Sequence, residues 1–145
     1  MLQKTALAIF FVLGLGLIVF GLIYLTASEF MPYHSDAIQT EWADLESNAQ
    51  GLFLGLLRGL GGGALIAGIA ATAMSWLAFR GTVAPYSVLL PVVCIGYFAI
   101  LGYAIATVRA LTPANPPWYV AVLGISVAFV ASFLLWIDGR RRNDA

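Results

Sequence analysis

The stretch GLFLGLLRGLGGGALIAGIAATAMSWLAF, residues 51–79, decides the fold of this chain. It holds a single charged side chain, that of Arg58. A helix needs about 20 apolar residues to cross the hydrocarbon core of a bilayer, so this stretch is long enough to span a membrane. Because lipid offers no partner to an unpaired backbone group, we expect an uninterrupted apolar run of this length to be helical.

Three further apolar runs flank this stretch, at residues 6–27, 83–108 and 118–137. Of the 145 residues, 61% are hydrophobic and only 10% are charged, which is more apolar surface than a soluble domain of this size can bury. The sequence therefore predicts an all-α integral membrane four-helix bundle that forms one domain, residues 1–145. The first run exceeds the roughly 7–15 residues of a signal-peptide core, so we interpret it as a span.

The basic residues indicate the orientation of the bundle. Lys4 precedes the first span, Arg80 follows the second, and Arg140, Arg141 and Arg142 lie in the tail, residues 138–145. The outer loop, residues 28–50, has no Lys or Arg. The positive-inside rule then predicts a multi-pass cell-membrane protein with both termini cytoplasmic, in the inner membrane if the chain is bacterial. The lipid bilayer is the first expected partner, and three tail arginines are too few to indicate nucleic-acid binding.

The outer loop is predicted to contain a short amphipathic helix from Asp36 to Gln50. Apolar side chains recur there at the spacing of one helix face, at Ile38, Trp42, Leu45 and Ala49. Pro32, just before, disfavours an earlier start of the helix. Two interpretations stay open: a helix resting on the bilayer or the bundle, and a lid over an outward-facing cavity.

Small residues occupy every fourth position of the second span and form what we call the spacing-four ladder: Gly51, Gly55, Gly59, Gly63, Ala67, Ala71 and Ser75. Small side chains let helix backbones approach closely, which favours helix association in lipid. Each step of four residues exceeds a full turn by roughly 40°, so the ladder winds around its helix. We expect different neighbours to pack on it at different depths; a glycine-lined ligand groove and a homodimer seam are the alternatives.

Three charged residues near the predicted outer face are the candidate ligand-binding or ion-pair residues. Arg58 and Arg109 lie at the outer ends of the second and third spans, and Glu29 follows the first. A charge within the membrane is costly, so it is expected to be paired or functional. Three readings stay open: an internal ion pair with Glu29, arginines that extend to the headgroups, and an anion or substrate site.

His34 is the only histidine, and it lies near Glu29, Asp36 and Glu41 in the sequence. These residue types can bind zinc, but their spacing matches no metal-binding pattern. We therefore expect no metal and no cofactor, and these four residues are the candidate ligands if a metal binds. The chain also lacks the motifs of phosphate loops, zinc peptidases and serine hydrolases.

The length, the four spans and the segment GLFLGLLRGLGGGALIAG, residues 51–68, resemble the small four-helix bacterial membrane proteins of the DoxX-like group. The resemblance implies the four-helix fold and assigns no catalytic residue.

Without a motif for chemistry, we expect a non-enzymatic accessory or partner-binding component that associates with a membrane-protein partner or with its own copies. Two alternatives stay open. One is a transporter or channel component with an outward-facing site at Arg58, Arg109 and Glu29. The other is a membrane enzyme with an outer-face site at Glu29 and His34.

Overall fold

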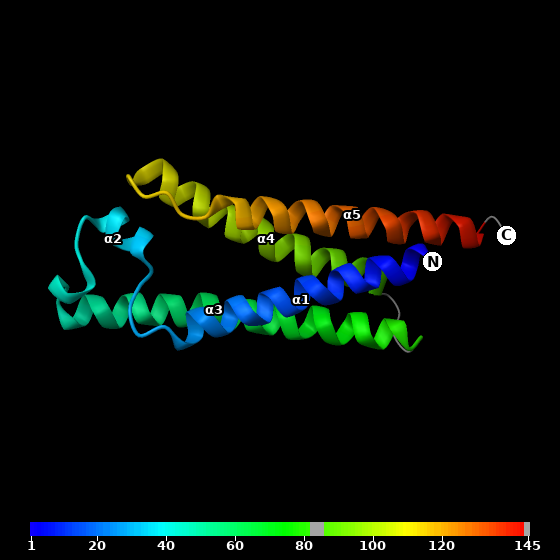
Figure 1. The fold of residues 1–145 in the computed structure, drawn as a ribbon, viewed down its shortest axis with the longest axis horizontal. Helices are drawn as coiled ribbons and strands as arrows, with labels where there is room; N and C mark the ends of the chain where they lie inside the picture. Colours follow the sequence, from blue (N-terminus) through cyan, green and yellow to red (C-terminus); the bar gives the residue numbers. More distant parts are fainter. Residues whose placement is uncertain (82–85, 144–145) are drawn as a thin grey trace.

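The computed structural model describes residues 1–81 and 86–143, and every element in these ranges is helical (Figure 1). The elements are α1 (Leu2–Thr26), α2 (Pro32–Ile38), the 3₁₀ turn η1 (Trp42–Asp44), α3 (Ser47–Phe79), α4 (Tyr86–Leu111) and α5 (Trp118–Asn143). The helices α1, α3, α4 and α5 are each long and apolar enough to cross a membrane. This result confirms the prediction of an all-helical chain with four candidate spans.

The helix bounds differ from the predicted spans mainly at the ends. The second span begins as α3 at Ser47 rather than at Gly51, and α5 continues past Ile137 through Asn143, so the basic tail begins as helix. The helix α4 runs on to Leu111. The predicted start of the third span, residue 83, lies outside the described residues.

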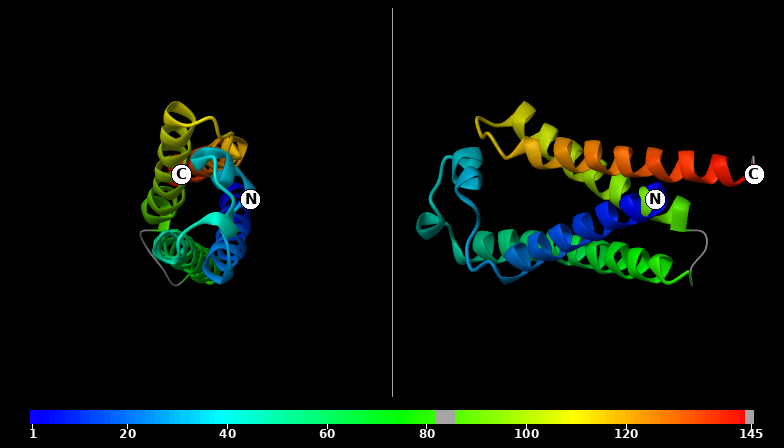
Figure 2. Two further views of the ribbon diagram at one scale, coloured as in Figure 1. Left: turned by 90° about the vertical axis from the view of Figure 1, so that its left-hand side faces the viewer. Right: turned by 45° about the vertical axis from the view of Figure 1, so that its right-hand side comes forward.

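The four long helices associate as two pairs, α1 with α3 and α4 with α5. Figure 2 shows the pairs diverging toward the end of the molecule that carries α2. Near the N-terminus of α1, a core that includes Leu7, Phe10, Leu90 and Leu135 joins all four helices. At the α2 end the corresponding apolar cluster contains residues of α1, α3 and the outer loop only. The bundle is therefore closed at one end and splayed at the other.

Four glycines, which we call the glycine seam, bring α1 and α3 together: Gly14 and Gly21 on α1, and Gly61 and Gly68 on α3. A Cβ built on Gly21 would lie 2.6 Å from the backbone nitrogen of Leu65 and 2.7 Å from the carbonyl oxygen of Gly61. A Cβ on Gly61 would in turn lie 2.7 Å from the carbonyl oxygen of Gly21. The glycines on each helix are seven residues apart, which is the heptad repeat of left-handed helix packing.

The spacing-four ladder is only partly a packing surface. Ala71 and Ser75 are buried in the core. The first four glycines of the ladder have no neighbouring heavy atom within 4 Å of a built Cβ: Gly51, Gly55, Gly59 and Gly63. A nearly antiparallel neighbour follows a spacing of about 3.5 residues, so a ladder with spacing four rotates away from it. Within the described residues, the outer half of the ladder therefore packs against no neighbouring helix of the same chain, and its alternative role as a homodimer seam stays a prediction.

The continuous outer helix predicted from Asp36 to Gln50 is wrong. The helix α2 ends at Ile38, because Gln39 adopts the left-handed conformation with φ of 55°. The turn η1 and extended backbone at Leu45 follow before α3 begins. Pro32 lies in the first turn of α2, where its missing N–H leaves no hydrogen bond unmade.

The apolar side chains of this loop nevertheless face inward, as the periodicity predicted. Ile38, Trp42 and Leu45 pack against a buried cluster that contains Phe30. The rings of Phe30 and Trp42 meet edge to face with centroids 5.0 Å apart. The loop is therefore fixed to the end of the bundle by a turn rather than by a single helix.

Candidate functional site

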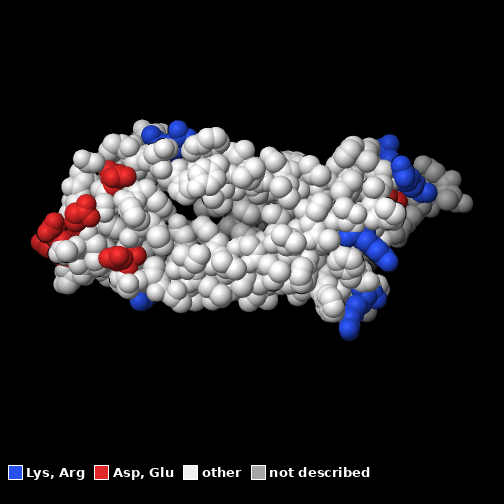
Figure 3. Space-filling model, in the orientation of Figure 1, with Lys and Arg blue, Asp and Glu red and all other residues white. Residues whose placement is uncertain are grey.

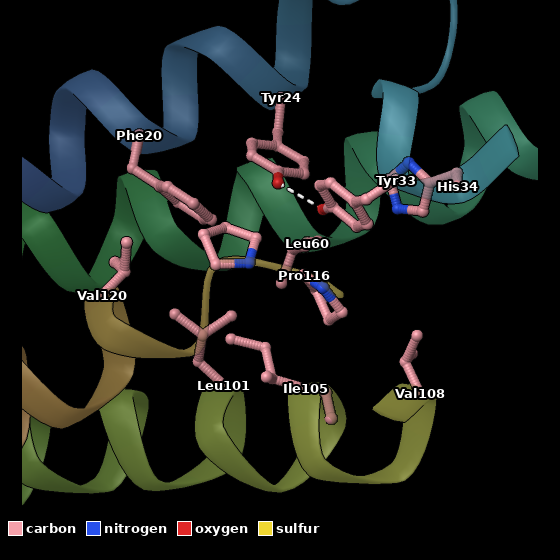
Figure 4. A pocket seen from close by; sticks show the side chains of 12 residues that line it. Phe20, Tyr24, Tyr33, His34, Leu60, Leu101, Ile105, Val108, Pro116 and Val120 are labelled. Atoms are coloured by element: carbon pink, nitrogen blue, oxygen red, sulfur yellow. Dashed lines mark hydrogen bonds between the residues drawn. The ribbon is translucent and has the colours of Figure 1, made fainter. Parts of the chain in front are cut away.

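An apolar cavity of about 130 Å³ lies at the splayed end of the bundle (Figure 4). The helices α1, α3, α4 and α5, the segment before α5, and α2 all contribute to its wall. Most of the wall consists of aliphatic and proline side chains, among them Leu60, Ile105 and Pro116. Its polar atoms come from two tyrosines and a histidine at the α2 side, so the cavity combines an apolar interior with a few defined hydrogen-bonding groups.

Tyr24 of α1 and Tyr33 of α2 meet at the edge of the cavity, with their hydroxyl oxygens 2.7 Å apart (Figure 4). One hydroxyl donates to the other, so the pair keeps one O–H donor that this bond does not use. Burial raises the pKa of Tyr33 above its usual value, and the hydrogen bond with Tyr24 raises it further. Tyr33 therefore stays protonated at neutral pH.

His34 is held by its own helix terminus. Its Nδ1 accepts a hydrogen bond of 3.0 Å from the backbone N–H of Met31, and its ring packs against that of Tyr33 in a tilted arrangement with centroids 4.1 Å apart. Burial lowers the pKa of His34, because desolvation disfavours the charged imidazolium. A neutral ring whose Nδ1 accepts carries its proton on Nε2, so His34 offers a second donor at the cavity.

A third hydroxyl lies deeper in the bundle. The hydroxyl of Tyr97 on α4 is buried and has no hydrogen-bond partner among the described residues. A buried hydroxyl without a partner costs about 1–3 kcal/mol, so this part of the bundle is poorly satisfied by the protein alone.

A larger apolar groove of about 440 Å³ adjoins the cavity between α1, α4 and α5. The cavity and the groove share Phe20, Leu101 and Val120 in their walls. Gly16 and Gly124 also line the groove. Its walls belong to helices that are long and apolar enough to span a membrane, so in a bilayer it would face lipid.

The charged residues predicted as a site lie outside this cavity. Glu29, Arg58 and Arg109 are all exposed, and no ion pair joins them in the part of the chain that the structure describes. The guanidinium of Arg109 instead lies 5.8 Å from the ring centroid of Trp118. Figure 3 shows the acidic side chains mostly at the α2 end and most basic side chains at the opposite end.

Of the four candidate metal ligands, the three carboxylates lie apart from His34. Glu29, Asp36 and Glu41 line a polar hollow of about 260 Å³ on the outer loop, whereas His34 lines the apolar cavity. Within residues 1–81 and 86–143, no group of three or more His, Cys, Asp or Glu side chains could hold a metal ion.

Sequence reasoning missed Tyr24 and Tyr33 as site residues, although it named His34. Both tyrosines have the character of aromatic residues at a membrane interface, which explains them without a site. Their meeting depends on the turn between α1 and α2, which local periodicity does not reveal.

The chain matches no family model, no curated protein and no solved structure. The resemblance to the DoxX-like group stays a prediction, and function has to be argued from the site.

Proposed function

We propose that this protein is a multi-pass membrane protein that binds a small, neutral and largely apolar molecule at its outer end. The observation that carries the proposal is the cavity of about 130 Å³, which has an apolar wall and hydrogen-bonding groups only at its α2 side. A dry apolar cavity of roughly 150 Å³ holds a benzene molecule, so this one is suited to a single six-membered ring. Concave apolar sites with a few convergent polar groups are typical ligand sites.

The proposal keeps the non-enzymatic part of the expectation and adds a small-molecule ligand to the expected accessory or partner-binding role. The transporter alternative has less support, since its three residues are exposed and no ion pair joins them within the described residues: Arg58, Arg109 and Glu29. The enzyme alternative requires Glu29 and His34 to act together, but they line different cavities. Association with a membrane-protein partner or with a second copy remains part of the proposal.

We also propose that the α2 end faces outward and that both termini are cytoplasmic. Acidic side chains predominate at the α2 end, whereas most basic side chains lie at the other end (Figure 3). This polarity agrees with the positive-inside rule. Labelling of a cysteine introduced at Gln39 by a membrane-impermeant maleimide in intact cells tests the orientation, and protection of that position would contradict it.

The binding proposal is tested with cyclohexanone, a neutral six-membered ring, titrated into the purified protein in nanodiscs and followed by ligand-observed NMR. Ala104 lines the cavity, so Ala104→Leu is expected to fill it and to lower the affinity at least tenfold. Ala106 is exposed on the same helix and does not line the cavity, so Ala106→Leu is the matched control and should bind as the wild type does. Equal affinity in the two variants, or no binding to the wild type, would overturn the proposal.

A further inference from the structure

Resting on the proposed function, we infer that the ligand is a neutral amphiphile with one hydrocarbon tail. Its head occupies the cavity at Tyr24, Tyr33 and His34, and its tail lies in the groove between α1, α4 and α5. The ligand reaches the site sideways from the bilayer. This inference adds the class of the ligand and its route to the binding site proposed above.

The tail is argued from the position of the groove. The groove and the cavity have Phe20, Leu101 and Val120 in common, so they are adjacent, and a head in the cavity with a tail in the groove is one continuous placement. Along α1 the groove extends from Val12 to Ile23, which is about 16 Å at 1.5 Å per residue. That length is close to one leaflet, since the whole hydrocarbon core is about 30 Å thick. In a bilayer, such a groove is surrounded by hydrocarbon chains, so a hydrocarbon tail can enter it.

The volume of the groove favours one tail over two. A dry cavity of roughly 150 Å³ holds benzene, which has six carbon atoms. On the same scale the groove of about 440 Å³ has room for roughly 18 carbon atoms, which is one fatty or prenyl chain. A phospholipid with two chains would leave its second chain outside the groove.

The chemistry of the head follows from the groups at the cavity. The tyrosine pair keeps one O–H donor, and neutral His34 presents Nε2–H, so the site offers donors and favours a carbonyl, ether or hydroxyl oxygen. No Lys or Arg lines the cavity, so an anionic head would lose its hydration without gaining a counter-charge. A compact, uncharged acceptor is the head that these groups can satisfy.

The tail placement is tested with 4-dodecylcyclohexanone that carries a photoreactive diazirine in its chain, bound to the wild-type protein in nanodiscs. Mass spectrometry then locates the labelled residues. We expect labelling to concentrate on residues 12–23 of α1 and 119–127 of α5, at least fivefold above the exposed lipid-facing residues Ile66 and Ile69 of α3. Even labelling of all lipid-facing segments would overturn the inference.

A matched pair of variants tests the groove: one fills it, the other does not, and neither disturbs the helix packing. A Cβ on Gly16 meets nothing within 4 Å, and Gly16 lines the groove, so Gly16→Leu fills the groove. Gly63 on α3 is equally open but does not line the groove, so Gly63→Leu is the control. Gly16→Leu should lower groove labelling at least fivefold and leave cyclohexanone binding unchanged, whereas Gly63→Leu should change neither.

The outcomes separate the two proposals. If Gly16→Leu labels like the wild type while Ala104→Leu still lowers the affinity for cyclohexanone at least tenfold, the cavity binds a ligand and the inference about the tail is wrong. If the wild type does not bind cyclohexanone, the proposed function fails. The head is tested with two competitors of 4-dodecylcyclohexanone. Dodecylcyclohexane has no acceptor and 4-dodecylcyclohexanecarboxylate is anionic, so each should compete at least tenfold more weakly than 4-dodecylcyclohexanone. Equal competition would refute the assignment of a neutral acceptor.

Discussion

Replacing Gly21 by alanine tests whether the glycine seam holds α1 against α3. The added Cβ would lie 2.6 Å from the backbone nitrogen of Leu65, whereas ordinary contact begins at 3.4 Å. Backbone atoms cannot rotate away as a side chain can, so the two helices must separate locally by about 0.8 Å, the difference between these two distances. A gap of roughly 0.5–1 Å forfeits a quarter to a half of the dispersion energy of the atoms that it separates.

The expected cost is about 1–3 kcal/mol, the usual range for overpacking a close contact. Alanine also has a higher helix propensity than glycine by about 1 kcal/mol, and this gain opposes the cost. Gly63→Ala isolates the opposing term, because Gly63 lies on α3 and a Cβ there meets nothing within 4 Å. The difference between Gly21→Ala and Gly63→Ala should therefore be about 1–3 kcal/mol, with Gly21→Ala the less stable.

The assay is reversible unfolding in mixed micelles, with steric trapping of the separated helices as the readout. Gly61→Ala should cost about as much as Gly21→Ala, because each Cβ would face the other residue's carbonyl oxygen at 2.7 Å. The double variant should cost less than the sum, since one separation of the helices relieves both clashes. Strict additivity, or a Gly21→Ala protein as stable as Gly63→Ala, would refute the reasoning.

Two further predictions concern the outer site. Burial lowers the pKa of His34, so the unfolded chain takes up the proton first as the pH falls. The stabilisation that comes from the neutral, buried ring is complete above the unfolded pKa of about 6.5 and is lost as the pH falls from there through the lowered pKa of the folded state. Thermal unfolding between pH 7.5 and 5.5 should show this loss, and His34→Gln, which keeps a side-chain acceptor for the Met31 N–H, should flatten the profile; an unchanged profile would contradict the assignment. Tyr33→Phe removes the bond to Tyr24, which should weaken docking of α2 by about 1 kcal/mol and speed its amide hydrogen exchange, while Tyr103→Phe, an exposed control, should leave exchange unchanged.

The four candidate spans could be predicted because lipid imposes one rule on every long apolar run. The face that each helix packs against its neighbour could not be predicted, since the glycines of the second span occupy several faces at once. The cue that was available is a match between helices: Gly14 and Gly21 are seven residues apart, as are Gly61 and Gly68. A spacing of seven on both partners is what an antiparallel heptad contact requires, whereas the ladder of spacing four on α3 has no counterpart on α1.

The candidate site was less predictable than the fold because it depends on contacts between distant segments. Tyr24 and Tyr33 come together through the turn after α1, and Ile105 and Pro116 reach the same cavity from α4 and the segment before α5. The sequence instead predicted a site at charged residues, because charges in a membrane are costly and are expected to be paired or functional. Arg58 is exposed and forms no ion pair with Glu29 within the described residues, so its presence in the apolar run did not mark a buried charged site.

The glycine seam also accounts for the existence of the cavity. At the closed end, Leu7 and Phe10 of α1 contact α4 and α5 through a shared core, so all four helices are held together there. Toward the other end, Gly21 lets α1 lie directly against the backbone of α3, and Tyr24, one turn later, packs with α3 and the outer loop. Close packing on α3 thus draws α1 away from α4 and α5, and the space left between the pairs is the cavity that α2 covers. The stability of the seam and the width of the site are therefore set by the same contact.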